Sequence, residues 1–274
     1  LIAGLPYEDY ESFKQSFNNA YDMKPDQLQL GFLKVLKGSY MYENRHEYEL
    51  VYHDYSPYEV MATKWIDYDE ILKLKNVEEV LEVYYNSNQF KCSLAYLLTV
   101  FSKPYDFYFE LSSYYEENNL FGLQQKRVVR YDILRKYARE KLTNKIDFKL
   151  LDEMLIIDLY MRENMKTRPE WGVNLDDYKE AFNEFFKNGG NKQLQLKKDG
   201  EDYQSKIVAR QMHIERVSKV AVEFIIGVEN QLIQNSTDFL SGENLQSQEN
   251  FFVFDYEKRS PLTNDAEIIF LKDI

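Results

Sequence analysis

Three histidines and a single cysteine are the side chains of this 274-residue sequence best suited to metal or nucleophilic chemistry. His213 and Glu215 stand two residues apart in a β-rich stretch, so on a strand they would share one face. A His–carboxylate pair can do acid–base work, although a structural hydrogen bond is the plainer interpretation. His46 and His53 lie seven residues apart in an irregular stretch, a spacing that matches no recognised metal site. Cys92 lies on a predicted helix and is interpreted as a small buried apolar residue.

The first forty residues hold a second candidate site. An apolar strand reaches a turn at Gly4-Leu5-Pro6, a helix is predicted from about Asp9 to Met23, and a second strand is predicted over 28–36. Strand, helix and strand in this order predict a parallel βαβ unit. A glycine in such a turn lets the backbone approach a ligand closely, because it has no Cβ. The plainer interpretation is a tight turn in which Glu8 or Asp9 favours the helix N-terminus. One βαβ unit makes neither a barrel nor an open sheet, so we expect a piece of a larger protein or further strands upstream.

Two stretches carry a resemblance to a known family, LIAGLPYED at the first strand and KPDQLQLGFLKVLKGSYM at the second. Together they resemble the last two βα units of a radical S-adenosylmethionine barrel. The stretch 55–87 is similar to the cobalamin-binding branch, which includes magnesium-protoporphyrin monomethyl ester oxidative cyclase-like proteins. Tyr7 stands where this family usually has glycine, and Lys37-Gly38-Ser39 stands where Pro-Gly-Thr is common. The resemblance covers about residues 1–90.

The resemblance implies an enzyme that uses a 4Fe–4S cluster, S-adenosylmethionine and cobalamin on a small-molecule substrate, as an oxidoreductase or cyclase, or as a methyltransferase. It also implies that four residues lie beside the adenosyl group in the intact protein: Gly4, Leu5, Pro6 and Glu8. The cluster needs three cysteine thiolates, and this sequence has one cysteine. We therefore expect the isolated chain to bind no metal or cofactor and to have no activity of its own. The cluster ligands are expected in upstream domains of the same polypeptide.

Hydrophobic periodicity and turn residues predict an α+β fold in three parts. Residues 1–88 are the end of a (β/α) barrel, residues 89–189 an α-helical bundle, and residues 190–274 a small antiparallel sheet. The predicted features of the third part are a hairpin at Asp199-Gly200 and strands that include 212–214, 220–226, 251–254 and 268–271. The charged stretch 255–261 is predicted to follow its strand, either as a cap of the sheet or as a charge cluster that faces a partner.

Composition limits the classes of function. Hydrophobic residues make up 44% of the chain, which is enough for a sizeable core. The formal net charge of −12 argues against nucleic acid as a partner, because phosphate binding needs a cationic surface. No apolar run approaches the roughly 20 residues of a membrane span, so a cytoplasmic location is expected. The 23 Tyr and 18 Phe either line a site for a flat ligand or, as is commoner, supply core area.

These observations predict a C-terminal fragment of a radical S-adenosylmethionine enzyme that shapes the substrate side of the barrel. The alternative is a non-catalytic protein-interaction module whose helices and acidic surface dock a partner. A hydrolase that uses His213 and Glu215 is a third and more remote hypothesis.

Overall fold

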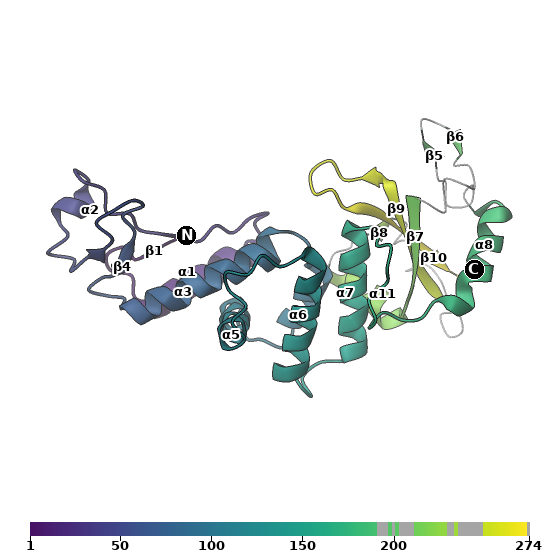
Figure 1. The fold of residues 1–274 in the computed structure, drawn as a ribbon, viewed down its shortest axis with the longest axis horizontal. Helices are drawn as coiled ribbons and strands as arrows, with labels where there is room; N and C mark the ends of the chain where they lie inside the picture. The colour runs from purple at the N-terminus through teal and green to yellow at the C-terminus, as the bar shows by residue number, and fades with distance from the viewer. Residues whose placement is uncertain (191–196, 199–200, 203–210, 229–232, 235–248, 273–274) are drawn as a thin grey trace. The chain divides into compact units, whose positions relative to one another are not determined.

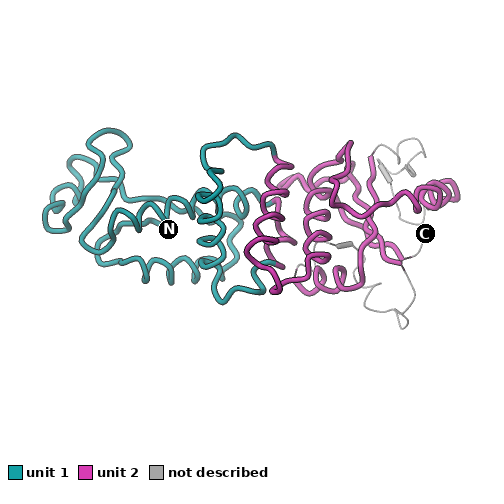
Figure 2. The backbone as a smooth tube through the Cα atoms, turned by 60° about the horizontal axis from the view of Figure 1, so that its bottom comes forward, with its two compact units in different colours: residues 1–88, 97–126 teal, residues 89–96, 127–274 magenta. Residues whose placement is uncertain are grey.

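The computed structural model describes residues 1–190, 197–198, 201–202, 211–228, 233–234 and 249–272 (Figure 1). The chain divides into two compact units (Figure 2), unit 1 with residues 1–88 and 97–126 and unit 2 with residues 89–96 and 127–274. The predicted boundary after residue 88 coincides with a change of unit. The predicted helical part, 89–189, is shared between the two units.

Unit 1 contains the predicted βαβ unit. Strands β1 (Ile2–Ala3) and β2 (Gly31–Phe32) pair in parallel, and helix α1 (Tyr10–Asp22) connects them. The carboxylate of Asp9 accepts a hydrogen bond from the backbone N–H of Ser12, which caps the N-terminus of α1. The phenylalanines four residues apart on one face of α1 are buried, as helical periodicity predicts.

Strand β2 is much shorter than the predicted stretch 28–36. Beyond Phe32 the chain leaves β1 and pairs with a later, antiparallel segment along the same edge, where Lys34 bridges to Glu59. The backbone N–H of Val60 donates to the carbonyl of Leu33, 2.8 Å away. The second strand of the unit is therefore parallel to β1 at its start and antiparallel to a later segment at its end.

The rest of unit 1 consists of a short hairpin and several helices. Its elements are α2 (Tyr40–Glu43), β3 (Val51–Tyr52), β4 (Val60–Ala62), α3 (Tyr68–Leu81), the π-helical turn η1 (Glu82–Asn86) and α5 (Pro104–Glu117). A capping box between Asp67 and Glu70 begins α3, and α3 packs along α5. Proline is the first residue of α5, where its missing N–H costs no helical hydrogen bond.

Tyrosine side chains supply much of the core of unit 1, which confirms the commoner interpretation of the aromatic content for these residues. Tyr84, Tyr105 and Tyr108 are completely or almost completely buried. Their hydroxyls are paired with other tyrosines, as between Tyr84 and Tyr115, whose oxygens lie 2.7 Å apart. Burial raises the pKa of Tyr108 well above its ordinary value. These rings therefore pack as apolar bodies whose hydroxyls stay protonated and hydrogen-bonded.

Unit 2 combines helices with a sheet. Its helices are α4 (Lys91–Leu98, at the boundary between the units), α6 (Arg127–Lys141), α7 (Phe148–Arg162), the 3₁₀ turn η2 (Asp176–Tyr178), α8 (Lys179–Lys187) and α11 (Lys219–Val228). Asp147 caps α7 by accepting a hydrogen bond from the backbone N–H of Lys149. The second half of α7 is buried on all sides, because it lies between α6 and the sheet.

The strands of this sheet are β7 (Met212–Val217), β9 (Asn250–Arg259), β10 (Ala266–Lys272) and β8 (Ile233–Gln234), in that order. The first three pair antiparallel, as predicted, and β8 pairs with β10 in parallel. A separate two-residue pair, β5 (Lys197–Lys198) with β6 (Glu201–Asp202), is antiparallel and flanks the predicted hairpin turn. That turn, at 199–200, lies outside the described residues.

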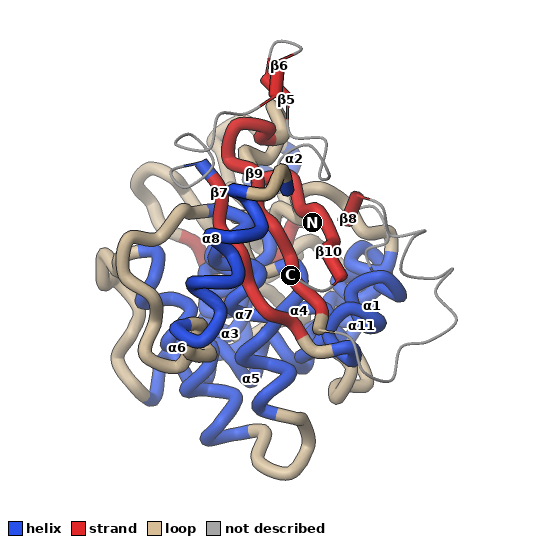
Figure 3. Tube along the Cα trace, turned by 90° about the vertical axis from the view of Figure 1, so that its right-hand side faces the viewer, coloured by secondary structure: helices blue, strands red, loops and turns tan. Residues whose placement is uncertain are grey.

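Each face of the sheet has its own helical cover (Figure 3). Met212 and Ile214 of β7 belong to an apolar cluster on one face, and Phe182 and Phe185 of α8 pack against this cluster. On the other face, Tyr160 of α7 stacks on a side chain of β7 and contacts β9. The sheet is therefore a buried middle layer, which accounts for its nearly continuous apolar strands.

Two predictions for this region are wrong. The stretch 220–226 was expected to be a strand but lies in helix α11, because Ala221, Val222 and Ile225 bury one helical face and Ser218 caps the N–H of Ala221. Short runs of β-branched residues do not distinguish a strand from a buried helix. The charged stretch that begins at Asp255 does not follow its strand, since β9 extends to Arg259 and Asp255 itself is buried.

The α+β fold class is confirmed. The structure has a parallel βαβ unit, a set of helices and a small, mainly antiparallel C-terminal sheet, and its described strands form no closed barrel. Within the described residues, no helix is both long enough and apolar enough to cross a membrane.

Candidate functional site

The turn after β1 is shaped by glycine at position 4. Gly4 has a φ of +83°, and a Cβ added to it would lie 2.6 Å from Cγ1 of Val60. Both the left-handed backbone and the neighbouring valine therefore require glycine here. The turn closes with the backbone N–H of Glu8 donating to the carbonyl of Leu5 at 3.4 Å.

The other candidate residues of this turn have structural partners. The Oε1 atom of Glu8 accepts a hydrogen bond from the hydroxyl of Ser16, 3.0 Å away, so this side chain is directed along α1. Leu5 and Pro6 are half-buried. The structure thus brings Gly4, Leu5, Pro6 and Glu8 together in one tight turn. The space that a ligand would need beside Gly4 is filled by Val60, so these four residues alone do not form a cradle for an adenosyl group.

His213 and Glu215 do lie on one face of β7, as predicted. Nε2 of His213 lies 2.5 Å from Oε1 of Glu215, and the imidazole stacks on the ring of Tyr160 with centroids 3.6 Å apart. Glu215 is only 1% exposed. Arg168 donates hydrogen bonds to both carboxylate oxygens of Glu215, and the bond from Nη2 is 2.6 Å long. Because the imidazole lies between a ring and a carboxylate that is already paired, this arrangement fits the structural hydrogen bond better than acid–base chemistry.

A cavity of about 390 Å³ lies next to this cluster in unit 2. Charged groups and apolar side chains line it together: Lys149, Asp152, Glu153, Ile156, Arg168, Trp171, Val173, Glu215, Arg216 and Val217. Most of its charges are engaged within the protein. Asp152 pairs with Arg135 and Arg139, and Arg216 lies 3.2 Å from Glu249. Burial raises the pKa of Glu153, whose carboxylate accepts hydrogen bonds from Ser218.

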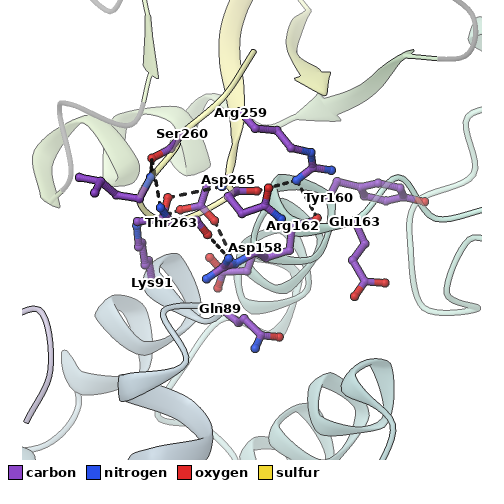
Figure 4. A network of polar contacts seen from close by, with 12 residues as sticks. Gln89, Lys91, Asp158, Tyr160, Arg162, Glu163, Arg259, Ser260, Thr263 and Asp265 are labelled. Carbon is purple, nitrogen blue, oxygen red and sulfur yellow. Dashed lines mark hydrogen bonds and ion pairs between the residues drawn. The ribbon is translucent and has the colours of Figure 1, made fainter. Parts of the chain in front are cut away.

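Two further buried carboxylates fasten unit 2 together (Figure 4). Asp265, in the turn before β10, lies 2.9 Å from Nε of Arg162 and 3.1 Å from Nζ of Lys91. Asp158 of α7 accepts hydrogen bonds from the backbone N–H groups of Cys92 and Ser93, at 2.9 and 2.8 Å. Asp158 therefore caps the first turn of α4 from a neighbouring helix. Burial raises its pKa to about 6.

Sequence reasoning did not find Arg168, Asp158 or Asp265. Each acts on a group far away in the chain; Arg168, for example, lies 47 residues from Glu215. A single sequence contains no signal for such pairs, whereas the pairing of His213 with Glu215 follows from strand periodicity alone.

Metal-binding side chains do not converge in the described part of the chain. No group of three or more His, Cys, Asp or Glu side chains there has the arrangement of a metal site. His53 lies against the ring of Tyr55 instead, with centroids 5.0 Å apart. Cys92 is 2% exposed on α4, as its interpretation as a small buried residue predicts.

Fold and site together define a mixed α+β protein with a parallel βαβ unit and a buried histidine–glutamate–arginine cluster. The chain belongs to the family described as "Protein of unknown function (DUF4080)", whose model matches residues 46–240. The match includes Arg168, His213 and Glu215 but not the turn at Gly4. None of the curated proteins compared matches the chain.

Proposed function

We propose that this chain is the C-terminal part of a radical S-adenosylmethionine enzyme of the cobalamin-binding, magnesium-protoporphyrin cyclase-like branch. The β1–α1–β2 unit would be the end of its catalytic barrel, and residues 89–274 would shape the substrate side. The reaction would be of the oxidoreductase or methyltransferase type, on a small-molecule substrate. The observation that carries the proposal is the parallel βαβ unit with its glycine turn and one open strand edge.

Among the described residues, no strand pairs with the edge of β1 that faces away from β2. The carbonyls of Leu1 and Ala3 accept hydrogen bonds from β2 and the residue after it, each at 2.9 Å. Alternate residues of a strand face opposite edges, so the peptide groups of Ile2 face away from β2. Ile2 is 51% exposed. The edge of β1 at Ile2 therefore has room for an additional parallel strand, where a preceding barrel strand belongs.

The family adds support at a coarser level. DUF4080 is associated with radical S-adenosylmethionine and cobalamin-binding proteins, without indicating a branch. The family match covers residues 46–240 and the resemblance about residues 1–90, so the two overlap over residues 46–90. The residues before 46 support this class of protein separately from the family match.

The cofactors of this class do not fit the residues of this chain alone. A 4Fe–4S cluster is held by several thiolates, and the single cysteine is buried in the first turn of α4, where its backbone N–H donates a hydrogen bond to Asp158. We therefore assign cluster and cobalamin binding to upstream domains of the same polypeptide, which are also its proposed partners. For the whole protein we propose a cytoplasmic location, where thiolates stay reduced.

Anaerobic reconstitution of the 274-residue chain with iron and sulfide tests this assignment. We expect no stoichiometric iron–sulfur absorbance from this chain. We expect a bound iron–sulfur cluster in the longer polypeptide that contains it. Stoichiometric absorbance from this chain alone would contradict the assignment. A longer reading frame without a Cys-x-x-x-Cys-x-x-Cys motif, together with tight binding of a protein partner, would favour the interaction module instead.

A further inference from the structure

Four aromatic side chains gather where the parallel strands of unit 1 end. Tyr7 follows β1 directly after the glycine turn, and Tyr40 begins α2 after the second strand. Tyr48 and Trp65 come from the segments on either side of the β3–β4 hairpin. These four residues are called the aromatic cluster. The carboxyl ends of parallel strands are where βα folds bind their ligands. The aromatic cluster therefore lies where a ligand site is expected.

Tyr48 is the centre of the aromatic cluster. Its ring centroid lies 6.1 Å from Tyr7, 6.4 Å from Tyr40 and 5.8 Å from Trp65. Tyr7 and Trp65 also contact one another, with centroids 4.8 Å apart. Tyr48 is 5% exposed, whereas Tyr7 is 74% and Tyr40 is 66% exposed. A buried ring thus supports two rings that are mostly exposed.

The backbone of Tyr7 is in an unfavourable conformation. Its φ is +69°, a left-handed value that residues with a Cβ rarely adopt. Because the ring is mostly exposed, burial does not compensate for this conformation. Such strain is concentrated at sites where a side chain must be held in a given place. Tyr7 is also the position at which the sequence departs from the glycine usual in the family it resembles.

Hydroxyl groups connect the rings at their edges. The hydroxyls of Tyr40 and Tyr48 lie 3.2 Å apart. Hydrogen bonds with Tyr40, burial and a hydrogen bond with Tyr7 raise the pKa of Tyr48. The aromatic cluster therefore offers mostly exposed rings together with a connected set of neutral hydroxyl donors and acceptors.

We propose that the aromatic cluster is a binding site for a planar conjugated ring, which stacks on Tyr7 and reaches the tyrosine hydroxyls with a polar substituent. The assignment rests on the proposed function, since it names the class of substrate that the barrel would receive. A cation held between several rings fits less well, because the rings contact one another at 4.8–6.1 Å and leave no space between Tyr7, Tyr48 and Trp65.

The chain contains two tryptophans, which allows a direct test. In the 274-residue chain labelled with 5-fluorotryptophan, ¹⁹F NMR gives one signal for Trp65 and one for Trp171, and Trp171→Phe assigns them. The probe is 2-naphthol, and the control ligand is decahydro-2-naphthol, which keeps the hydroxyl and the ring size but has no π face. We expect 2-naphthol to shift the Trp65 signal saturably and to leave Trp171 unchanged, with no response to the saturated analogue.

Two matched variants separate binding from folding. Tyr7→Gly removes the ring at a position where glycine adopts the backbone freely, so the variant should fold and bind 2-naphthol about tenfold more weakly. Tyr58→Gly is the control, because Tyr58 also has a positive φ, of +58°, but lies outside the aromatic cluster. Three results would each overturn the proposal. Tyr7→Gly could bind 2-naphthol as tightly as the unsubstituted chain, or the chain could bind the saturated analogue as tightly as 2-naphthol. The signals of Trp65 and Trp171 could also shift equally with 2-naphthol. Cluster reconstitution in the longer polypeptide does not affect these readouts, so failure of either proposal is recognised separately.

Discussion

At the scale of single residues, the ion pair between Arg168 and Glu215 is a largely buried polar contact. The carboxylate is 1% exposed and the arginine side chain 24% exposed. Removal of one partner from such a pair leaves a buried charge without compensation. The pair therefore holds the loop before α8 to strand β7 and makes both residues costly to replace.

Substitution Arg168→Leu should lower the free energy of unfolding by about 3 kcal/mol, because it leaves the buried carboxylate of Glu215 with only the imidazole of His213 as a side-chain partner among the described residues. Urea unfolding followed by circular dichroism measures this change. The control is Lys136→Leu, which removes an exposed pair with Glu140 at 3.7 Å and should cost less than about 1 kcal/mol. Similar losses for both variants would show that Glu215 does not depend on Arg168.

Asp158 should make stability depend on pH. Its pKa is raised to about 6 in the folded chain, from an ordinary value of 3.8. Between these values the folded protein holds a proton that the unfolded chain has released, so the contribution of this group to stability falls as pH rises. Asp158→Asn does not titrate. The stability of wild type relative to this variant should therefore fall by roughly 2–3 kcal/mol from pH 4 to pH 7. A difference in unfolding free energy that is constant with pH, or rises, would contradict this account.

At the scale of elements, the sequence predicts those helices whose ends carry local signals. Asp9, Asp67 and Asp147 are helix caps that reach only two or three residues along the chain, so each is visible in the sequence. Helix α11 has no comparable acidic cap, and its β-branched run predicts a strand. The length of β2 was also missed, because the antiparallel segment that ends its pairing with β1 comes about 25 residues later in the chain.

The candidate sites follow the same division. The glycine turn and the His213–Glu215 pair are local patterns and were predicted. Arg168 on Glu215 and Val60 against Gly4 join distant parts of the chain, and nothing in one sequence specifies them. The wider surroundings of each site therefore required the structure.

The turn between β1 and α1 should tolerate no side chain at its glycine. Gly4→Ala adds a Cβ at 2.6 Å from Val60 to a left-handed backbone, so a loss of about 2–4 kcal/mol is expected. Gly38→Ala is the matched control, because Gly38 has a φ of +81° with nothing within 4 Å of the added Cβ, and about 1 kcal/mol should be lost. Thermal or urea unfolding compares them. Equal losses would mean that Val60 moves aside and that the turn has room for a ligand.

At the scale of the whole molecule, two units serve different purposes in the proposed enzyme. Unit 1 presents the βαβ end with its open β1 edge and the aromatic cluster beside the strand ends. Unit 2 builds a sheet with helices on both faces and fastens it through buried carboxylates. The open edge is where upstream strands would complete a barrel, and the net charge of −12 fits a small-molecule substrate better than nucleic acid.

The most direct test of the central claim uses the longest polypeptide that contains this chain. After anaerobic reconstitution with iron, sulfide and cobalamin, it is incubated with S-adenosylmethionine and a low-potential reductant, and 5′-deoxyadenosine is measured by mass spectrometry. The account predicts reductant-dependent formation of 5′-deoxyadenosine. A polypeptide that carries its full complement of iron–sulfur cluster and forms none would contradict the radical S-adenosylmethionine assignment.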